Sequence, residues 1–217
     1  MSIPPLEPAG IRTLAELLQR LGGVPLERIL FRPCPGSAGP PDILDTEQRD
    51  GLRCELIAGV LVEKATGPRE ASLTAQLAQR LRDFVRTHDL GAVSSPEGAF
   101  ELMADLVRRP NVAFTHWDRL PDRQLPAAAI PRLVPNLAVE VLARANTTAE
   151  VAVKRQDYFA AGVEVLWEID PQHRTVACLD FGTGASAMLR FTDTLTGGTL
   201  LPGFALPVAE LFAERGR

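Results

Sequence analysis

The amino-acid sequence predicts an α/β (α+β) fold, in which a mixed β-sheet is flanked by helices and preceded by an N-terminal helical extension. Two segments, 69–88 and 148–161, carry apolar residues at helical spacing. Several short apolar runs are bounded by turn residues, which is typical of strands. One run, 137–142, is almost continuously apolar, as in a strand that is covered on both faces. Strands that alternate with only two long helices favour a mixed sheet with helices packed against it.

The first 52 residues are interpreted as an extension, and residues 53–217 as the main domain. Thr13 and Glu16 form a capping box, and leucines at helical spacing follow it until two glycines end the run. This pattern predicts one short amphipathic helix. A loop rich in Pro and Gly follows at 33–41, and the main domain begins near Arg53.

The main domain is predicted to begin with a hairpin of strands 54–57 and 60–62, because Ala58-Gly59 provides a turn between two apolar runs. A helix over 69–88 follows. The further elements are strands at 91–94, 99–103 and 106–114, a Pro-rich connection at 121–135, a strand at 137–142, a helix at 148–161 that ends at Gly162, a hairpin of 163–169 with 175–180, a short strand at 189–191, and a closing segment at 206–212.

Composition and charge exclude several classes of protein. With 46% hydrophobic and 23% charged residues, the chain has enough apolar surface for a sizeable core, so it is neither disordered nor collagen-like. No apolar stretch reaches the length of a membrane-spanning helix, and residues 1–10 lack the pattern of a secretory signal. Three scattered cysteines favour a reducing cytoplasm. The net charge of −4 provides no global electrostatic argument for nucleic acid.

Glu140 is the most unusual residue of the sequence, because it lies in the middle of an apolar run. On a strand, its neighbours on the same face are Ala138 and Leu142. An unpaired buried carboxylate is costly, so such a residue is usually bonded to a cation, a metal or several donors. From this residue alone, a structural ion pair with an arginine such as Arg144 is an equally good interpretation.

Two further segments contain candidate functional residues. In the strand predicted around 108–114, Asn111 and Ala113 share one face. In the helix that follows the Glu140 strand, Lys154 lies at the edge of the apolar arc. Its ammonium group either reaches solvent, which is the commoner fate of a lysine, or leans back over the strand toward Glu140.

The order and spacing of several motifs resemble the Uma-two family of predicted restriction endonucleases, within the PD-(D/E)xK nuclease superfamily. The resemblance spans about residues 53–212. It rests on Glu55-Leu-Ile-Ala-Gly59-Val-Leu-Val-Glu63, Arg109-Pro-Asn-Val-Ala-Phe114, Pro135-Asn-Leu-Ala-Val-Glu-Val-Leu142, Asn146-Thr147, Lys154, Tyr158, Ala161-Gly-Val163, Trp167 and Asp170-Pro171.

The resemblance implies a restriction endonuclease-like fold and a metal-dependent DNA endonuclease. In the family pattern, an Asp after the proline and a Glu on the next core strand bind a divalent metal, and these positions are Asn111 and Glu140. The catalytic lysine maps onto Lys154, and Glu55 maps onto an accessory metal or water ligand. Mg²⁺ or Mn²⁺ would be the cofactor, because such an ion neutralises charge on the phosphate and lowers the pKa of an attacking water.

The sequence departs from the family pattern at important positions. Asn111 replaces the metal-binding Asp, and its neutral amide should weaken metal binding. Position 142, where the superfamily usually has a lysine, is Leu, and the residues after the core strand are Ala143-Arg144. Three hypotheses therefore stand together: a weakened endonuclease, an inactive nuclease fold that binds DNA or a protein, and an α/β domain in which Glu140 only pairs with an arginine.

DNA is the expected partner if the nuclease resemblance holds. Arg108, Arg109 and Arg144 could contribute to a surface that faces phosphates, although scattered arginines on an acidic chain are more often a solvated exterior. No recognition helix or zinc finger is present, so sequence-specific reading of DNA is not predicted. A homodimer is expected by analogy with the family alone.

Overall fold

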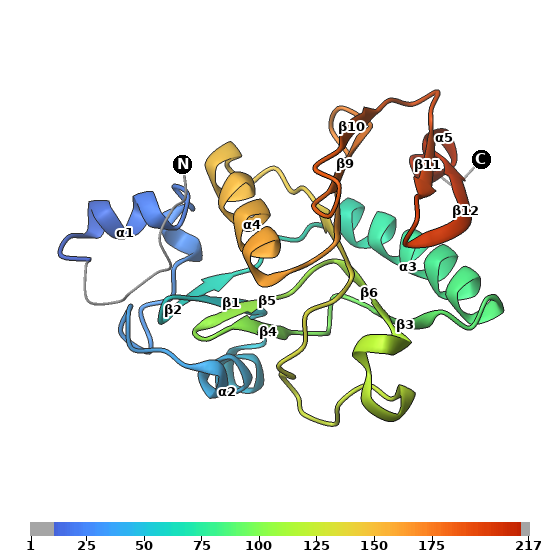
Figure 1. Cartoon of the computed structure of the whole chain (residues 1–217). Helices are drawn as coiled ribbons and strands as arrows, with labels where there is room; N and C mark the ends of the chain where they lie inside the picture. The colour runs from blue at the N-terminus through green and yellow to red at the C-terminus, as the bar shows by residue number, and fades with distance from the viewer. Residues whose placement is uncertain (1–10, 214–217) are drawn as a thin grey trace.

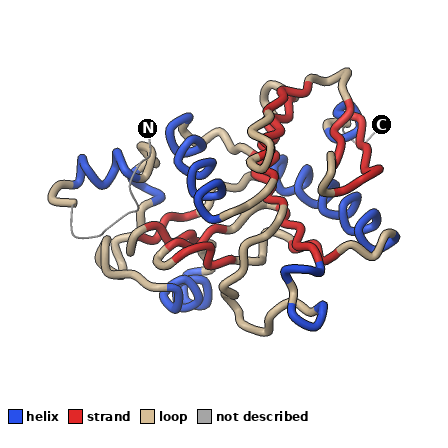
Figure 2. The backbone as a smooth tube through the Cα atoms, in the orientation of Figure 1, coloured by secondary structure: helices blue, strands red, loops and turns tan. Residues whose placement is uncertain are grey.

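The computed structural model describes residues 11–213, and Figures 1 and 2 show how its helices and strands are arranged. The helices are α1 (Leu14–Arg20), α2 (Pro40–Asp50), α3 (Pro68–Thr87), α4 (Thr148–Ala161) and α5 (Val208–Leu211). The strands are β1 (Cys54–Ile57), β2 (Val60–Glu63), β3 (Gly91–Ser94), β4 (Phe100–Met103), β5 (Leu106–Arg108), β6 (Val112–His116), β7 (Leu137–Val141), β8 (Val165–Asp170), β9 (Thr175–Asp180), β10 (Ser186–Leu189), β11 (Thr194–Gly197) and β12 (Leu201–Pro207).

A six-stranded mixed sheet forms the centre of the fold, with the strand order β10-β9-β8-β7-β6-β3. β7 is parallel to β8 and antiparallel to β6, and the other pairs are antiparallel. A second sheet has the order β2-β1-β5-β4, and β11 and β12 form a separate hairpin. The predicted mixed sheet flanked by helices is therefore confirmed.

Helices cover both faces of the central strand β7, which explains its continuous apolar run. Leu77 and Leu81 of α3 belong to one core cluster together with Val139. Tyr158 of α4 belongs to a second cluster together with Ala138. All five residues of β7 are buried, as the sequence predicted for a strand covered on both sides.

The strand predicted over 106–114 is in fact two strands in two different sheets. β5 ends at Arg108 and β6 begins at Val112, because Pro110 has no N–H to donate to a ladder. β5 pairs with β1 and β4, whereas β6 pairs with β3 and β7. The residues between them, including Asn111, therefore lie at the junction of the two sheets.

The structure also contains elements that the sequence did not predict. α2 occupies the end of the segment that was interpreted as a Pro- and Gly-rich loop. Pro40 and Pro41 begin this helix, where the missing N–H of proline costs little, and Asp42 accepts the backbone N–H of Gly39 at 2.7 Å. The last predicted strand lies earlier, at β10, and the closing segment is the end of the β11–β12 hairpin followed by α5. No helix within residues 11–213 has both the length and the apolar character needed to cross a lipid bilayer.

Candidate active site

Glu140 is buried on β7 and its carboxylate accepts hydrogen bonds from several cationic or polar groups. Its side chain faces α4, on the side of the sheet that also carries Ala138. The Tyr158 hydroxyl donates to Oε1 at 2.6 Å, and the Lys64 ammonium donates to Oε2 at 3.1 Å. Lys154 Nζ lies 3.5 Å from the same oxygen. Within the described residues, Glu140 therefore pairs with lysines and a tyrosine rather than with the arginine that one sequence hypothesis invoked.

Glu55 on β1 is the second buried carboxylate of the site, and it is 1% exposed. Arg108 Nη1 donates to Oε2 at 2.8 Å, and the backbone N–H of Arg109 donates to Oε1 at 3.1 Å. Lys154 Nζ approaches Oε2 to 3.1 Å. Burial by itself would raise the pKa of Glu55, but the charges of Lys154 and Arg108 outweigh burial and hold this pKa below its ordinary value.

Lys154 connects the two carboxylates. It is one of three buried residues on α4, with Glu150 and Tyr158, and their spacing of four residues places all three on the helix face toward the sheet. Burial lowers the pKa of a lysine, but the charges of Glu140 and Glu55 outweigh burial and raise the pKa of Lys154. Of the two positions that the sequence left open for this side chain, the structure shows the one that leans toward Glu140.

Lys64 is a site residue that sequence reasoning missed. It directly follows β2, and its Nζ donates both to Glu140 Oε2 and to the backbone carbonyl oxygen of Arg109. Its side chain is 5% exposed. Burial lowers the pKa of Lys64, and the nearby charge of Lys154 adds to this shift, although Glu140 opposes it.

Two signals in the sequence could have pointed to Lys64. The first is register: Val62 pairs with Glu55 across the hairpin, so the residue two positions after Val62 shares the face of Glu55. The second is composition. The chain has 23 lysines and arginines, and only two of them are lysines, namely Lys64 and Lys154. Both lie at this cluster, where each ammonium contacts Glu140.

Tyr158 has both a packing role and a polar role in the structure. The ring is buried in the apolar cluster beneath α4, while the hydroxyl donates to Glu140. Burial raises the pKa of Tyr158 well above its ordinary value, and the neighbouring charges of Glu140 and Glu55 raise it further. The phenol therefore remains a hydrogen-bond donor at neutral pH.

Asn111 lies beside the cluster, but both ends of its amide are used within the protein. Its Oδ1 accepts the backbone N–H of Val141 at 3.1 Å, and its Nδ2 donates to the Thr74 hydroxyl at 3.1 Å. Its own backbone N–H donates to the carbonyl of Val139 at 2.8 Å. The side chain thus extends the β6–β7 ladder and joins it to α3, and it supplies no negative charge.

The structure places Arg108 and Arg109 in the interior, so the surface position expected for them is wrong. Each is 1% exposed. Arg108 binds Glu55 and Asp157, and Arg109 donates to Glu47 Oε2 at 2.6 Å and to the carbonyls of Cys54 and Glu97 at 3.1 Å each. Carboxylates on neighbouring elements draw these guanidinium groups inward. Arg144 is exposed.

The charges of the cluster balance without a metal ion. A continuous series of ion pairs links three cations and three carboxylates: Lys64, Glu140, Lys154, Glu55, Arg108 and Asp157. Each oxygen of Glu140 and Glu55 already accepts at least one donor, and so does the Asn111 oxygen. Residues 11–213 contain no group of three or more His, Cys, Asp or Glu side chains placed to hold a metal. In this arrangement the residues do not fit Mg²⁺ or Mn²⁺.

An open cleft of about 720 Å³ reaches the cluster from the surface. Lys64, Asn111 and Thr74 line it, as do the cationic side chains of Arg53 and Arg82. Glu140 does not line the cleft. It borders a separate cavity of about 10 Å³, on the side of Lys154 and Glu168. Lys64 therefore stands between the open cleft and Glu140.

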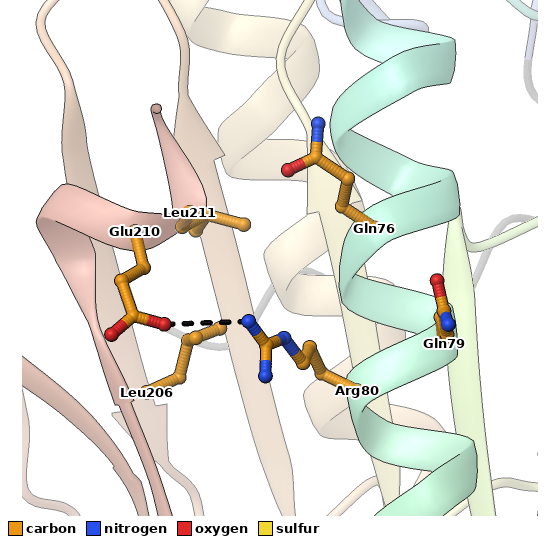
Figure 3. Close-up of a pocket in the computed structure, with 6 residues that line it drawn as sticks. All are labelled: Gln76, Gln79, Arg80, Leu206, Glu210 and Leu211. Carbon is orange, nitrogen blue, oxygen red and sulfur yellow. Dashed lines mark hydrogen bonds and ion pairs between the residues drawn. The ribbon is translucent and has the colours of Figure 1, made fainter. Parts of the chain in front are cut away.

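A different hollow lies between α3 and α5, and Gln79 of α3 lines both this hollow and the cleft (Figure 3). Its volume is about 40 Å³, and an ion pair between Arg80 and Glu210, 3.4 Å apart, spans it. Both side chains are about half exposed, at 50% and 55%. The hollow is too small for a nucleotide or a cofactor. The cleft beside Lys64 is the candidate binding site because it is large and reaches the cluster.

The central mixed sheet, its covering helices and the buried Glu–Lys cluster define a protein of the restriction endonuclease-like fold. A crystal structure described as "a putative nuclease belonging to DUF820" from Anabaena variabilis ATCC 29413 has a TM-score of 0.64 and 16% identity, and the match covers 75% of this chain and 90% of that chain. The model of the Uma2 family, described as "Putative restriction endonuclease", matches residues 40–209. The chain belongs to this family. No curated protein matches it significantly.

The match to the family model confirms the family resemblance that was inferred from the sequence motifs. Membership of this family implies nucleic acid as the class of substrate. Glu55, Glu140 and Lys154, three of the four positions carried over from the family pattern, come together in one buried cluster. The fourth, Asn111, lies next to the cluster on the adjoining strand end, and its amide is bound to backbone and to Thr74.

Proposed function

We propose that this protein binds DNA in the cleft between α3 and the β1–β2 hairpin, and that it does not hydrolyse DNA with Mg²⁺ or Mn²⁺ as the chain stands. The observation that carries the proposal is that Lys64 separates the cleft from Glu140 while all candidate ligand oxygens are already bonded. This is the inactive nuclease fold that the sequence raised as an alternative. A cytoplasmic location fits such a role.

DNA suits the cleft because of the cationic and polar groups at its rim. Arg82 on α3 is exposed and forms no ion pair with another residue in the described range 11–213. Arg53 is also exposed, although Glu97 lies 3.2 Å away and weakens its positive field. Thr66 and Ser95 add hydroxyl groups to the lining. Such groups bind phosphate oxygens without reading base sequence, so binding should weaken as salt rises.

A metal-dependent endonuclease is the second candidate function. It is favoured by the convergence of Glu55, Glu140 and Lys154 from three separate elements, β1, β7 and α4. A bound divalent ion would supply Lewis-acid chemistry at the phosphate. The chain itself would supply the carboxylates and the Lys154 ammonium. For this function, Lys64 would have to leave Glu140 when the ion and DNA bind.

Binding can be tested by fluorescence anisotropy of a labelled DNA duplex at several salt concentrations. Arg82→Glu should weaken binding and reduce the salt slope by about one. Arg86→Glu is the matched control. It makes the same change of charge on the same helix, but Arg86 does not line the cleft. Equal effects of the two substitutions would refute binding in the cleft.

Catalysis can be tested by nicking of a supercoiled plasmid with Mg²⁺ or Mn²⁺. The proposal expects no cleavage above that of Glu140→Gln. Cleavage by the wild-type chain that Glu140→Gln abolishes would establish the endonuclease and remove the proposal of an inactive centre. DNA binding and cleavage are measured separately, so each half of the proposed function stands or fails by its own assay.

A further inference from the structure

We propose that the Lys64 ammonium is the resident cation of the Glu140 site and that it keeps divalent metals out. This inference rests on the proposed function, because it explains why a chain of a nuclease family lacks a fitting metal site. It goes further by assigning the exclusion to one side chain that is outside the family motifs identified in the sequence.

The contacts of Lys64 are those of a cation held by hard oxygen ligands. Its Nζ donates to a carboxylate oxygen of Glu140 at 3.1 Å and to the backbone carbonyl oxygen of Arg109. Carboxylate and carbonyl oxygens are also the ligands that divalent cations such as Ca²⁺ and Mg²⁺ select. An ammonium at this position offers Glu140 charge compensation and satisfies a buried carbonyl, so both oxygens are stabilised without an ion from solvent.

The position of Lys64 also controls access. Lys64 and Asn111 line the open cleft, whereas Glu140 does not line it and borders a small cavity beside Lys154 and Glu168. A cation that enters from solvent through the cleft therefore meets the Lys64 charge before it can reach Glu140. With 5% of its side chain exposed, Lys64 fills this position rather than extending into solvent.

The charge balance makes the exclusion stronger. With Asn111 neutral, the three buried cations already match the three carboxylates of the cluster, so a divalent ion would add two uncompensated positive charges.

Combining Lys64→Met with Asn111→Asp would make the local charge more negative by two. Asp at this position could still accept the N–H of Val141 with one oxygen, and its second oxygen could accept from the Thr74 hydroxyl and face an added ion.

The test is a titration of the full chain with Mn²⁺, in which electron paramagnetic resonance counts the free ion. The wild-type chain should bind no more Mn²⁺ than Glu140→Gln does. The double variant Lys64→Met/Asn111→Asp should bind one ion, more than about tenfold more tightly than the wild type. The matched control is Arg82→Met/Asn111→Asp, which removes a cleft cation that does not touch Glu140. This control should bind Mn²⁺ at least about fivefold more weakly than Lys64→Met/Asn111→Asp does.

A folded double variant that binds Mn²⁺ no better than the wild type would overturn the proposal, because Lys64 would then be only a structural partner of Glu140. Wild-type binding that Glu140→Gln abolishes would overturn it as well. Neither result would affect DNA binding through Arg82, so the DNA-binding half of the proposed function stands or fails separately from this inference.

A second measurement needs no variant. The chain has only two lysines, so protein with ¹³C-labelled lysine gives two resolvable sets of lysine signals in an NMR spectrum. Both side chains touch Glu140. Paramagnetic Mn²⁺ bound there would broaden both sets at substoichiometric concentration, and that result would overturn the proposal. Signals that remain sharp would support it even if the double variant does not fold.

Discussion

Lys64 and Glu140 should behave as one energetic unit when the protein unfolds. Removing either partner leaves the other buried and poorly compensated, because their side chains are 5% and 7% exposed. Breaking a buried pair in this way costs about 3–5 kcal/mol. Lys154 and Tyr158 still contact Glu140 when Lys64 is absent, so we expect Lys64→Met to cost about 3 kcal/mol, the lower end of this range.

A double-mutant cycle tests this coupling. Glu140→Gln alone leaves two ammonium groups without their shared carboxylate and should cost a similar amount. Once Lys64 is removed, Glu140→Gln should cost less, with a coupling energy of about 2 kcal/mol. The assay is urea unfolding at neutral pH followed by tryptophan fluorescence, to which the buried Trp167 contributes. Additivity of the two substitutions within about 0.5 kcal/mol would refute the coupling. The exposed pair Asp83 and Arg86 is the control, and its coupling should be near zero.

Three further predictions concern acid stability, the N-terminal segment and the β1–β2 turn. The Glu55 pKa lies below its ordinary value of 4.5 in the folded state, so the stability that Glu55 gives the fold is complete above that pH and is lost as pH falls further. Glu55→Gln should therefore flatten the acid side of a plot of Tm against pH, and an unchanged acid side would contradict this. Arg28→Met should cost about 3 kcal/mol in urea unfolding, because Arg28 makes two bonds of 2.9 Å to buried Glu150; a loss below about 1 kcal/mol would show that the pair acts like a surface one. Gly59→Ala should lower the free energy of unfolding by more than about 1 kcal/mol, since Gly59 has φ +74° and a Cβ would lie 2.6 Å from the backbone of Gly36; an unchanged unfolding midpoint would refute this.

The central part of the fold could be predicted from the sequence because local signals and packing agree there. The helix at 148–161 has the bounds predicted, since the Thr147 side chain accepts the N–H of Glu150 at its start and Gly162 adopts φ 91° at its end. The hairpin at 54–62 was recognised from its turn residues. The Gly39-Pro40-Pro41 segment was taken as part of a loop, although proline at the first helical position also favours a helix start.

The candidate site could be predicted only where a residue conflicts with its local pattern. Glu140 was found because a carboxylate inside an apolar strand needs partners, and the partners are indeed present. Local pattern says nothing about which distant groups supply them. Lys64 follows a strand in an ordinary way, and only its register on the face of Glu55 and the scarcity of lysine in the chain set it apart. The burial of Arg108 and Arg109 depends on carboxylates far away in the sequence, such as Asp157 and Glu47, so no local motif could indicate it.

The most direct test of the account is a crystal structure grown in Mn²⁺ and measured at the manganese absorption edge. The account predicts no anomalous density within coordination distance, about 2–2.5 Å, of the Glu140 carboxylate. It also predicts that Lys64 Nζ remains in hydrogen-bond contact with that carboxylate, as it is in this structure at 3.1 Å. Manganese density between Glu140 and Asn111, with the Lys64 side chain displaced into the cleft, would contradict the account.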